Sequence, residues 1–196
     1  SLEALPQGAV VGTGSLRRRA QLWRLRPDLQ IEDARGNVDT RLRKLQDGQF
    51  DALILAEAGV ARLELAARVT QLIPRAIMLP AVGQGALGLE TRTDDVATRE
   101  LVAQLDHVDT HRAVLAERAM LASLRGGCLA PVGAYGRLES DGALHLDAVV
   151  LSVDGRQRLH VQRSADPLQA VTLGQAVAAD LLAQGAAELI AQSRSR

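Results

Sequence analysis

Two arginine clusters in the first quarter of the chain have the composition of anion-binding turns. Residues 12–19 read GTGSLRRR, and residues 35–41 read RGNVDTR. Backbone N–H groups at a turn that opens a helix bind anions, and guanidinium groups pair with carboxylates or phosphates. Three arginines at the start of a helix also oppose its dipole, which an anionic ligand would offset. The alternative for each cluster is a solvated basic helix face.

The elements around the two clusters predict how they are positioned. Each cluster follows an apolar run and precedes a helical pattern, with Ser15 and Asn37 as expected N-caps. The order βαβαβαβ is typical of a mostly parallel sheet, so both turns should meet in one crevice at its carboxyl edge. The arginines expected in that crevice are Arg17, Arg18, Arg35 and Arg41. The predicted strands are residues 8–12, 29–35, 51–56 and 69–73, and the predicted helices are residues 16–26, 38–47 and 57–66.

The rest of the chain predicts a second, smaller α+β unit. A turn-rich region at residues 79–91 leads into a strand expected at 86–90. Asp-Gly pairs then separate three strand-like runs, which predicts a three-stranded antiparallel sheet covered by helices. The expected strands are residues 132–138, 143–151 and 156–163, and the expected helices are residues 96–105 after Asp94 and Asp95, 110–124, 167–182 and 186 onward.

Cys128 is the only cysteine and follows Arg125, Gly126 and Gly127. Glycines leave the thiol unshielded, and a neighbouring arginine favours the thiolate. A buried, inert cysteine is the alternative. A single cysteine excludes an intrachain disulfide and suits a reducing compartment, so we expect a cytoplasmic protein.

A metal site is not favoured by the remaining polar residues. His107 and His111 stand four residues apart near Asp106 and Asp109, but no third ligand motif accompanies them. We therefore expect surface side chains there, with Asp109 capping a helix. Three further acidic residues show no pairing typical of a general acid and base, namely Glu57, Glu64 and Glu117.

Composition argues against two classes of partner. The formal net charge is zero and aromatic residues are 2% of the chain. These values argue against a basic footprint for nucleic acid or an anionic membrane, and against base stacking. No apolar run approaches the length of a membrane span, so we expect neither nucleic acid nor a membrane as a partner.

Six short motifs occur in the order typical of one enzyme family. They are VGTGSLRR at 11–18, RGNVDTRL at 35–42, DALILA at 51–56, LPAVGQGA at 79–86, ERAM at 117–120 and GGC at 126–128. Together they resemble the porphobilinogen deaminase family over residues 1–191, with Gly14 where a second serine is expected.

The resemblance implies three domains, of which the first two are similar to periplasmic-binding-protein lobes with a mostly parallel sheet. Residues 1–84 would form the central anion-binding domain. Residues 85–105 would return to a first domain whose N-terminal segment is missing here. Residues 106–196 would form the smaller cofactor-carrying α+β domain.

The resemblance also implies an activity. The family joins four porphobilinogen molecules head to tail, with loss of ammonia, to give hydroxymethylbilane for porphyrin and haem biosynthesis. The product grows on a dipyrromethane cofactor attached through a thioether to a cysteine, which is Cys128 here. No metal is implied, and we expect a monomer. The residues implied to contact the cofactor are Thr13, Ser15, Arg17, Arg18 and Gln84, and those implied to meet substrate carboxylates are Arg35, Arg41 and Arg62.

One part of the family's machinery does not occur in this sequence. The family uses an aspartate in a Lys-Asp motif to assist the departure of ammonia, whereas Lys44, the only lysine, precedes Leu45. We therefore expect this stretch alone to be inactive. Two other interpretations stay open. A solute-binding or effector-binding module would bind a small dicarboxylate reversibly, and an RNA-binding surface on the arginine helix would bind in a salt-sensitive manner.

Overall fold

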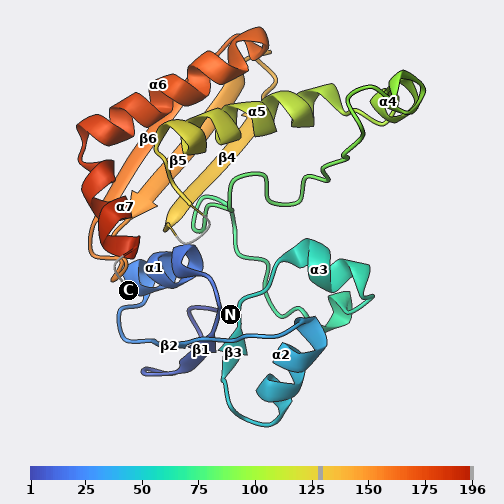
Figure 1. Cartoon of the computed structure of the whole chain (residues 1–196). Helices are drawn as coiled ribbons and strands as arrows, with labels where there is room; N and C mark the ends of the chain where they lie inside the picture. The colour runs from blue at the N-terminus through green and yellow to red at the C-terminus, as the bar shows by residue number, and fades with distance from the viewer. Residues whose placement is uncertain (128–129, 195–196) are drawn as a thin grey trace.

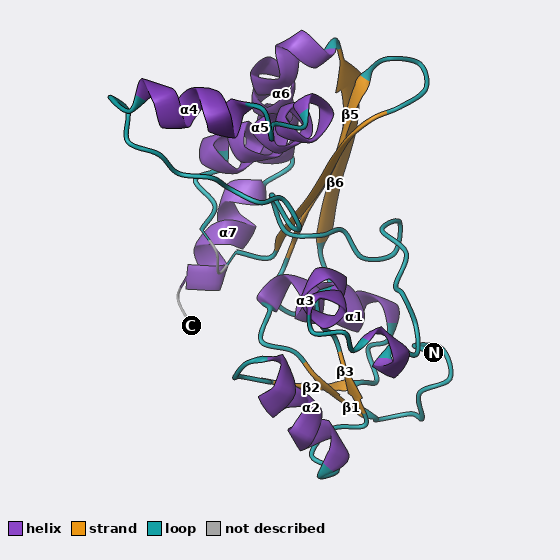
Figure 2. Ribbon diagram, turned by 90° about the vertical axis from the view of Figure 1, so that its right-hand side faces the viewer, coloured by secondary structure: helices purple, strands orange, loops and turns teal. Residues whose placement is uncertain are grey.

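The fold consists of two units joined by a long connecting segment, residues 80–107 (Figure 1). The structure, a computed structural model, describes residues 1–127 and 130–194. Each unit contains a three-stranded sheet, which is parallel in the first unit and antiparallel in the second. The mixed α/β class expected from the sequence is therefore confirmed. Figure 2 shows the same two units from the side.

The first unit alternates strands and helices as expected. Its elements are β1 (Val10–Gly12), α1 (Leu16–Leu25), β2 (Gln30–Glu32), α2 (Val38–Gln46), β3 (Ala52–Leu53), α3 (Glu57–Arg62) and the 3-10 turn η1 (Ala66–Arg68). Strand β1 is central, and it pairs in parallel with β2 on one side and β3 on the other. The strand order β2-β1-β3 places the loops after all three strands at one edge of the sheet.

Two expectations for this unit are wrong. The helix predicted at 57–66 ends at Arg62, because Glu64 adopts the left-handed conformation (φ 58°) that helices do not continue through. The strand predicted at 69–73 pairs with no neighbour in the described chain. Side chains hold this segment instead, since Gln71 Oε1 accepts a hydrogen bond from the Leu2 N–H (2.6 Å) and Ile73 packs against the core.

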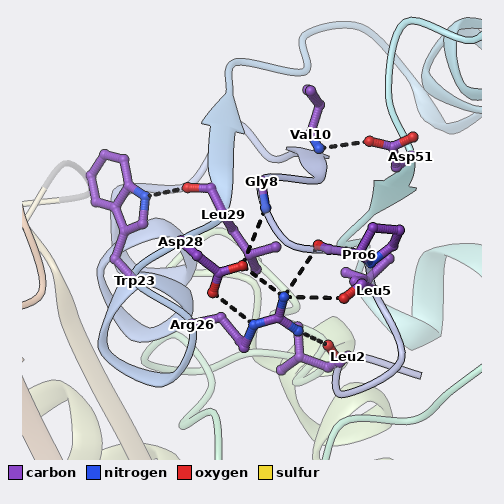
Figure 3. Close-up of polar contacts among 10 residues, drawn as sticks. All are labelled: Leu2, Leu5, Pro6, Gly8, Val10, Trp23, Arg26, Asp28, Leu29 and Asp51. Atoms are coloured by element: carbon purple, nitrogen blue, oxygen red, sulfur yellow. Dashed lines mark hydrogen bonds and ion pairs between the residues drawn. The ribbon is translucent and has the colours of Figure 1, made fainter.

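Arg26, which follows α1, fastens the N-terminal segment to the first unit (Figure 3). Its guanidinium donates to the carbonyl oxygens of Leu2 (2.9 Å) and Leu5 (3.1 Å) and pairs with Asp28 (2.7 Å). The bond from Arg26 holds the pKa of Asp28 well below its ordinary value. Asp28 Oδ2 also accepts from the Gly8 N–H (3.3 Å). These contacts set the path of the chain into β1 and the turn that follows it.

The connecting segment carries one helix, α4 (Val96–Ala103), which stands apart from both units in Figure 1. Asp95 caps it as expected, because its side chain accepts from the Thr98 N–H (3.1 Å). The strand expected at 86–90 is wrong, since no described strand lies beside it to complete a ladder. The large apolar side chains exposed along this segment are Leu87, Leu89, Val96, Leu101 and Leu105.

The second unit confirms the three-stranded meander. Its elements are α5 (Val108–Ser123), β4 (Val132–Leu138), β5 (Leu144–Leu151), β6 (Arg158–Ala165), η2 (Pro167–Gln169), α6 (Ala170–Ala183) and α7 (Ala186–Arg194). The order is β4-β5-β6, antiparallel throughout, with α5 and α6 packed against one face (Figure 1). Gly142 and Gly155 have positive φ values, as the predicted hairpin turns require. Among the described residues, no helix is long and apolar enough to cross a membrane.

The two units touch through the other face of the antiparallel sheet. Val149 and Leu151 of β5 pack with Leu79 and with Ala20 of α1. The hairpin after β5 also lies directly against α1, because a Cβ on Gly155 would come within 2.3 Å of the Ala20 carbonyl oxygen. This close packing encloses Leu79 and the start of the connecting segment.

Candidate functional site

The turn after β1 has the cap predicted from the sequence. The Ser15 side chain accepts a hydrogen bond from the Arg18 N–H (3.4 Å), and Ser15 donates its own N–H to Thr13 Oγ1 (3.3 Å). Thr13 is only 1% exposed. Both hydroxyl oxygens thus accept from backbone N–H groups, which leaves each O–H available to donate.

Arg17 is a buried cation at the start of α1. Its side chain is 6% exposed, and Nη1 donates to the Leu79 carbonyl oxygen. Gln21 contacts the same peptide, donating to the Leu79 carbonyl (3.1 Å) and accepting from the Leu79 N–H (2.8 Å). Burial, and secondarily the charge of Arg18, lower the pKa of Arg17 to about 10. Arg17 therefore remains charged at neutral pH.

Arg18 lies beside Arg17 and faces β3. Its Nη1 donates to the carbonyl oxygen of Ile54 (2.9 Å). Burial lowers the pKa of Arg18, and the charge of Arg41 lowers it further. Within residues 1–127 and 130–194, neither Arg17 nor Arg18 forms an ion pair with a carboxylate. The two guanidinium groups are thus close and partly desolvated, and no carboxylate in the described part of the chain pairs with them.

A cavity of about 870 Å³ lies between the two units, and both arginines are among the residues that line it. Arg17 and Arg18 line it from the first unit, and Glu117 and Tyr135 line it from the second. This volume is typical of pockets for small organic ligands. The other charged residues in its lining are Arg68, Arg75, Arg137, Asp51, Glu57 and Asp109.

The second arginine cluster lies outside this cavity. Arg35 pairs with Asp33 (2.7 Å), and its side chain is 87% exposed. Arg41 donates from Nε to the Gly36 carbonyl oxygen (2.8 Å) and is half-buried, whereas Arg62 at the end of α3 is exposed. The structure thus brings Arg17 and Arg18 into the cavity, with the charge of Arg41 acting on Arg18 from α2. Arg35 and Arg62 do not join them.

Two further residues implied by the resemblance complete this comparison. Gln84 is exposed and lines the cavity from a turn. The glycines on either side of it, Gly83 and Gly85, have φ values of 68° and 84°. Cys128 lies outside the described residues.

Glu117 is a feature of the site that the sequence analysis missed. It lies on the inner face of α5 and is 5% exposed. Oε2 accepts from the Gly83 N–H (2.6 Å) and Oε1 accepts from the Gly136 N–H (2.7 Å). Burial raises the pKa of Glu117, and the two N–H donors oppose that shift. Its place in the helical period of Ala113 and Met120, which are buried, was the available signal.

The histidines near α5 have local structural roles. His107, not Asp109 as expected, is the N-cap of α5, because its ring nitrogen accepts from the Thr110 N–H (3.3 Å). Asp109 lies in the first turn, where its charge complements the helix dipole. His111 contacts Asp106 (2.9 Å). In the part of the chain that the structure describes, no three potential metal ligands gather.

Comparison with known proteins agrees with the motif resemblance. Two family models match the chain. They are described as "Porphobilinogen deaminase, dipyromethane cofactor binding domain" over residues 1–100 and "Porphobilinogen deaminase, C-terminal domain" over residues 111–183. A curated relative from Desulforudis audaxviator (strain MP104C), named porphobilinogen deaminase, is 54% identical over 194 residues. The alignment covers 99% of this chain and 62% of the relative, so the chain spans less than two thirds of that protein's length. On these matches, the chain belongs to the porphobilinogen deaminase family.

Proposed function

We propose that the longer protein represented by this chain is a hydroxymethylbilane synthase, a transferase of tetrapyrrole biosynthesis. It would join four porphobilinogen molecules head to tail, and each addition would release ammonia. Family membership supports the reaction class. The volume of the cavity and the two arginines that line it support binding of a small anionic ligand.

A single observation carries the proposal. Arg17 and Arg18 line the cavity, and neither guanidinium pairs with a carboxylate among the described residues. Burying adjacent like charges is costly unless a counter-charge joins them. Dipyrromethane bears an acetate and a propionate on each ring, so its carboxylates would supply that counter-charge in paired hydrogen bonds. Thr13 and Ser15 would add O–H donors, and Gln84 would close the far wall.

The cofactor would be held as a thioether by Cys128. When bound, it supplies the pyrrole carbon on which the product chain is extended. The described residues would hold its carboxylates, orient its rings and keep water from the cavity. None of them has to transfer a proton for this role.

Incoming porphobilinogen would meet the solvent-accessible arginines of the second cluster and of α3, namely Arg35, Arg41 and Arg62. Arg41 supports this best, because its charge already influences Arg18. Exposed cations beside a buried cationic site attract anionic substrates toward it. Successive carboxylates would then pass from these arginines to Arg17 and Arg18.

The finer fold assignment is also part of the proposal. We expect residues 1–84 to be a periplasmic-binding-protein-like lobe, residues 85–105 to return to a first domain, and residues 106–196 to carry the cofactor. The exposure of Leu87 (90%) and Leu105 (73%) supports a covering domain over the connecting segment. A monomer in the cytoplasm, binding neither nucleic acid nor membrane, fits the single cysteine and zero net charge.

Intact mass spectrometry of the longer protein tests the proposal. Wild type should carry an added mass of two linked pyrrole rings, and Cys128→Ser should not. Adding porphobilinogen should produce further species, each heavier by one deaminated unit. An unmodified mass in protein that turns over porphobilinogen would refute the assignment. Reversible binding of a dicarboxylate without any adduct would support a solute-binding module, and salt-sensitive RNA binding would support the nucleic-acid interpretation.

A further inference from the structure

The geometry points to Glu117 as a positioning residue that holds the turn carrying Gln84 against the C-terminal unit. The turn comprises residues 81–86 and forms one wall of the cavity. The hydrogen bonds of Glu117 are observed whatever the function of the protein, and only the expected benefit to ligand binding rests on the proposed function.

Glu117 bridges two segments that are far apart in the chain. One carboxylate oxygen accepts from Gly83 in the turn (2.6 Å), and the other accepts from Gly136 in β4 (2.7 Å). Both bonds are short, as is typical when the acceptor is charged. Gly136 also lies so close to α5 that a Cβ would come within 2.8 Å of the Ala113 carbonyl oxygen. The helix, the strand and the turn therefore meet at this carboxylate.

Burying a carboxylate at this position costs free energy unless hydrogen-bond donors satisfy both of its oxygens. The inner face of α5 otherwise carries apolar residues such as Ala116 and Met120. No arginine or histidine within the described residues pairs with Glu117. Its charge is stabilised by two backbone N–H groups, and only a side chain with two acceptor oxygens satisfies both.

The turn depends on Glu117 because little else holds it. Its internal bonds are Gln84 N–H to Ala81 O (3.0 Å) and Ala86 N–H to Gly83 O (3.1 Å). Among residues 1–127 and 130–194, Glu117 is the only side chain that hydrogen-bonds to it. Val82 adds a partly buried apolar contact. Left-handed glycines on both sides of Gln84 give the unsupported turn wide conformational freedom.

The segment just before the turn is held independently. Leu79 is fastened to α1 by Arg17 and Gln21, and the Ala134 N–H donates to the Pro80 carbonyl oxygen (3.0 Å). Loss of the Glu117 carboxylate should therefore loosen the turn without releasing Leu79. This difference separates a positioning role from a general contribution to the core.

Amide hydrogen exchange followed by NMR in the longer protein tests the inference. In Glu117→Gln one oxygen is replaced by an NH₂ group, which cannot accept. In Glu117→Asp the charge stays but the reach is shorter by one methylene. Glu117→Asp should accelerate exchange at both Gly83 and Gly136, and Glu117→Gln at whichever of the two N–H groups faces the new amide, each by at least about tenfold, the equivalent of one lost hydrogen bond to a charged acceptor. Exchange at Leu79 should stay unchanged. Glu188→Gln, at an exposed position of α7, is the matched control and should change nothing.

Cofactor loading gives a second readout. Loading of the apo protein should slow about tenfold in both Glu117 variants, with turnover per loaded molecule much less affected. Unchanged exchange at Gly83 in Glu117→Asp, or equal acceleration throughout α5 and β4 in either variant, would overturn the inference. A third outcome separates the two proposals. If exchange accelerates locally at Gly83 but the wild-type protein carries no adduct, the positioning role of Glu117 stands and the proposed function is refuted.

Discussion

The turns after β1 and β2 share one local pattern and end in opposite environments. In each, a polar cap accepts from a backbone N–H three residues on, as Ser15 does from Arg18 (3.4 Å) and Asn37 does from Thr40 (2.9 Å). Each places arginine beside the cap. Yet Arg17 is 6% exposed, whereas the Arg35 side chain is 87% exposed.

The difference comes from what packs above each turn. Strand β1 is central, and the second unit covers α1 through Leu79 and the hairpin at Gly155. Strand β2 is at the sheet edge, and α2 has no buried residue. Burial at the first turn lowers the pKa of Arg17 and of Arg18, because it removes the water that would stabilise their charges. The same local pattern therefore gives a partly desolvated arginine pair at a cavity in one place and a largely solvated face in the other.

The largest expected effect is at the buried turn. Arg17→Leu in the longer protein should lower cofactor loading at least about thirtyfold, since removing one partner of a buried charge pair costs about 2–5 kcal/mol. Intact mass and a porphyrin-formation assay measure it. Gln21→Leu is the matched control, because it also loses contacts to Leu79 but keeps the cation. If the two variants load equally poorly, the packing of Leu79 matters and the charge does not.

Substitutions at the exposed turn should have a smaller and different effect. Arg35→Leu or Arg41→Leu should load cofactor normally and slow elongation by no more than about fivefold, because solvent-accessible charge pairs contribute about 0.2–1 kcal/mol. Mass spectra during turnover would show partly extended species accumulating. Arg41→Leu should be the stronger of the two, since its charge acts on Arg18. Failure of loading in these variants would erase the contrast between the turns.

The pH dependence of anion binding should report on Arg17. Its folded pKa of about 10 lies below the ordinary 12.5, so it is charged below pH 10 and loses its charge above. In the cofactor-free Cys128→Ser variant, pyrophosphate should raise the melting temperature equally from pH 7 to 9. The increase should shrink as the pH passes 10. A constant increase up to pH 11, or one that survives Arg17→Leu, would place the anion elsewhere.

The smallest effect concerns stability at the exposed turn. Arg35→Ala breaks the pair with Asp33 and should change the free energy of unfolding by less than about 0.5 kcal/mol. Urea titration measures this difference. A change above about 1 kcal/mol would show that the second turn is less solvated than its exposure indicates.

Local rules in the sequence were sufficient for much of the fold. Hairpin glycines and alternating apolar residues predicted β4, β5 and β6, and serine, asparagine and aspartate predicted three of the helix caps. Each of these features depends on neighbours within a few residues. The predictions of strands at 69–73 and 86–90 were wrong, because a strand also needs a hydrogen-bonded neighbour, which no local pattern reveals.

The sequence by itself determined the residue chemistry of the site. The spacing of its arginines predicted an anion-binding turn, and its six ordered motifs carried the resemblance to the family before any geometry was known. Only the tertiary structure decided which arginines are buried and that Glu117 joins helix, strand and turn. Burial and long-range hydrogen bonds depend on residues distant in the chain. Identical local patterns therefore cannot distinguish a desolvated cation from a solvated one.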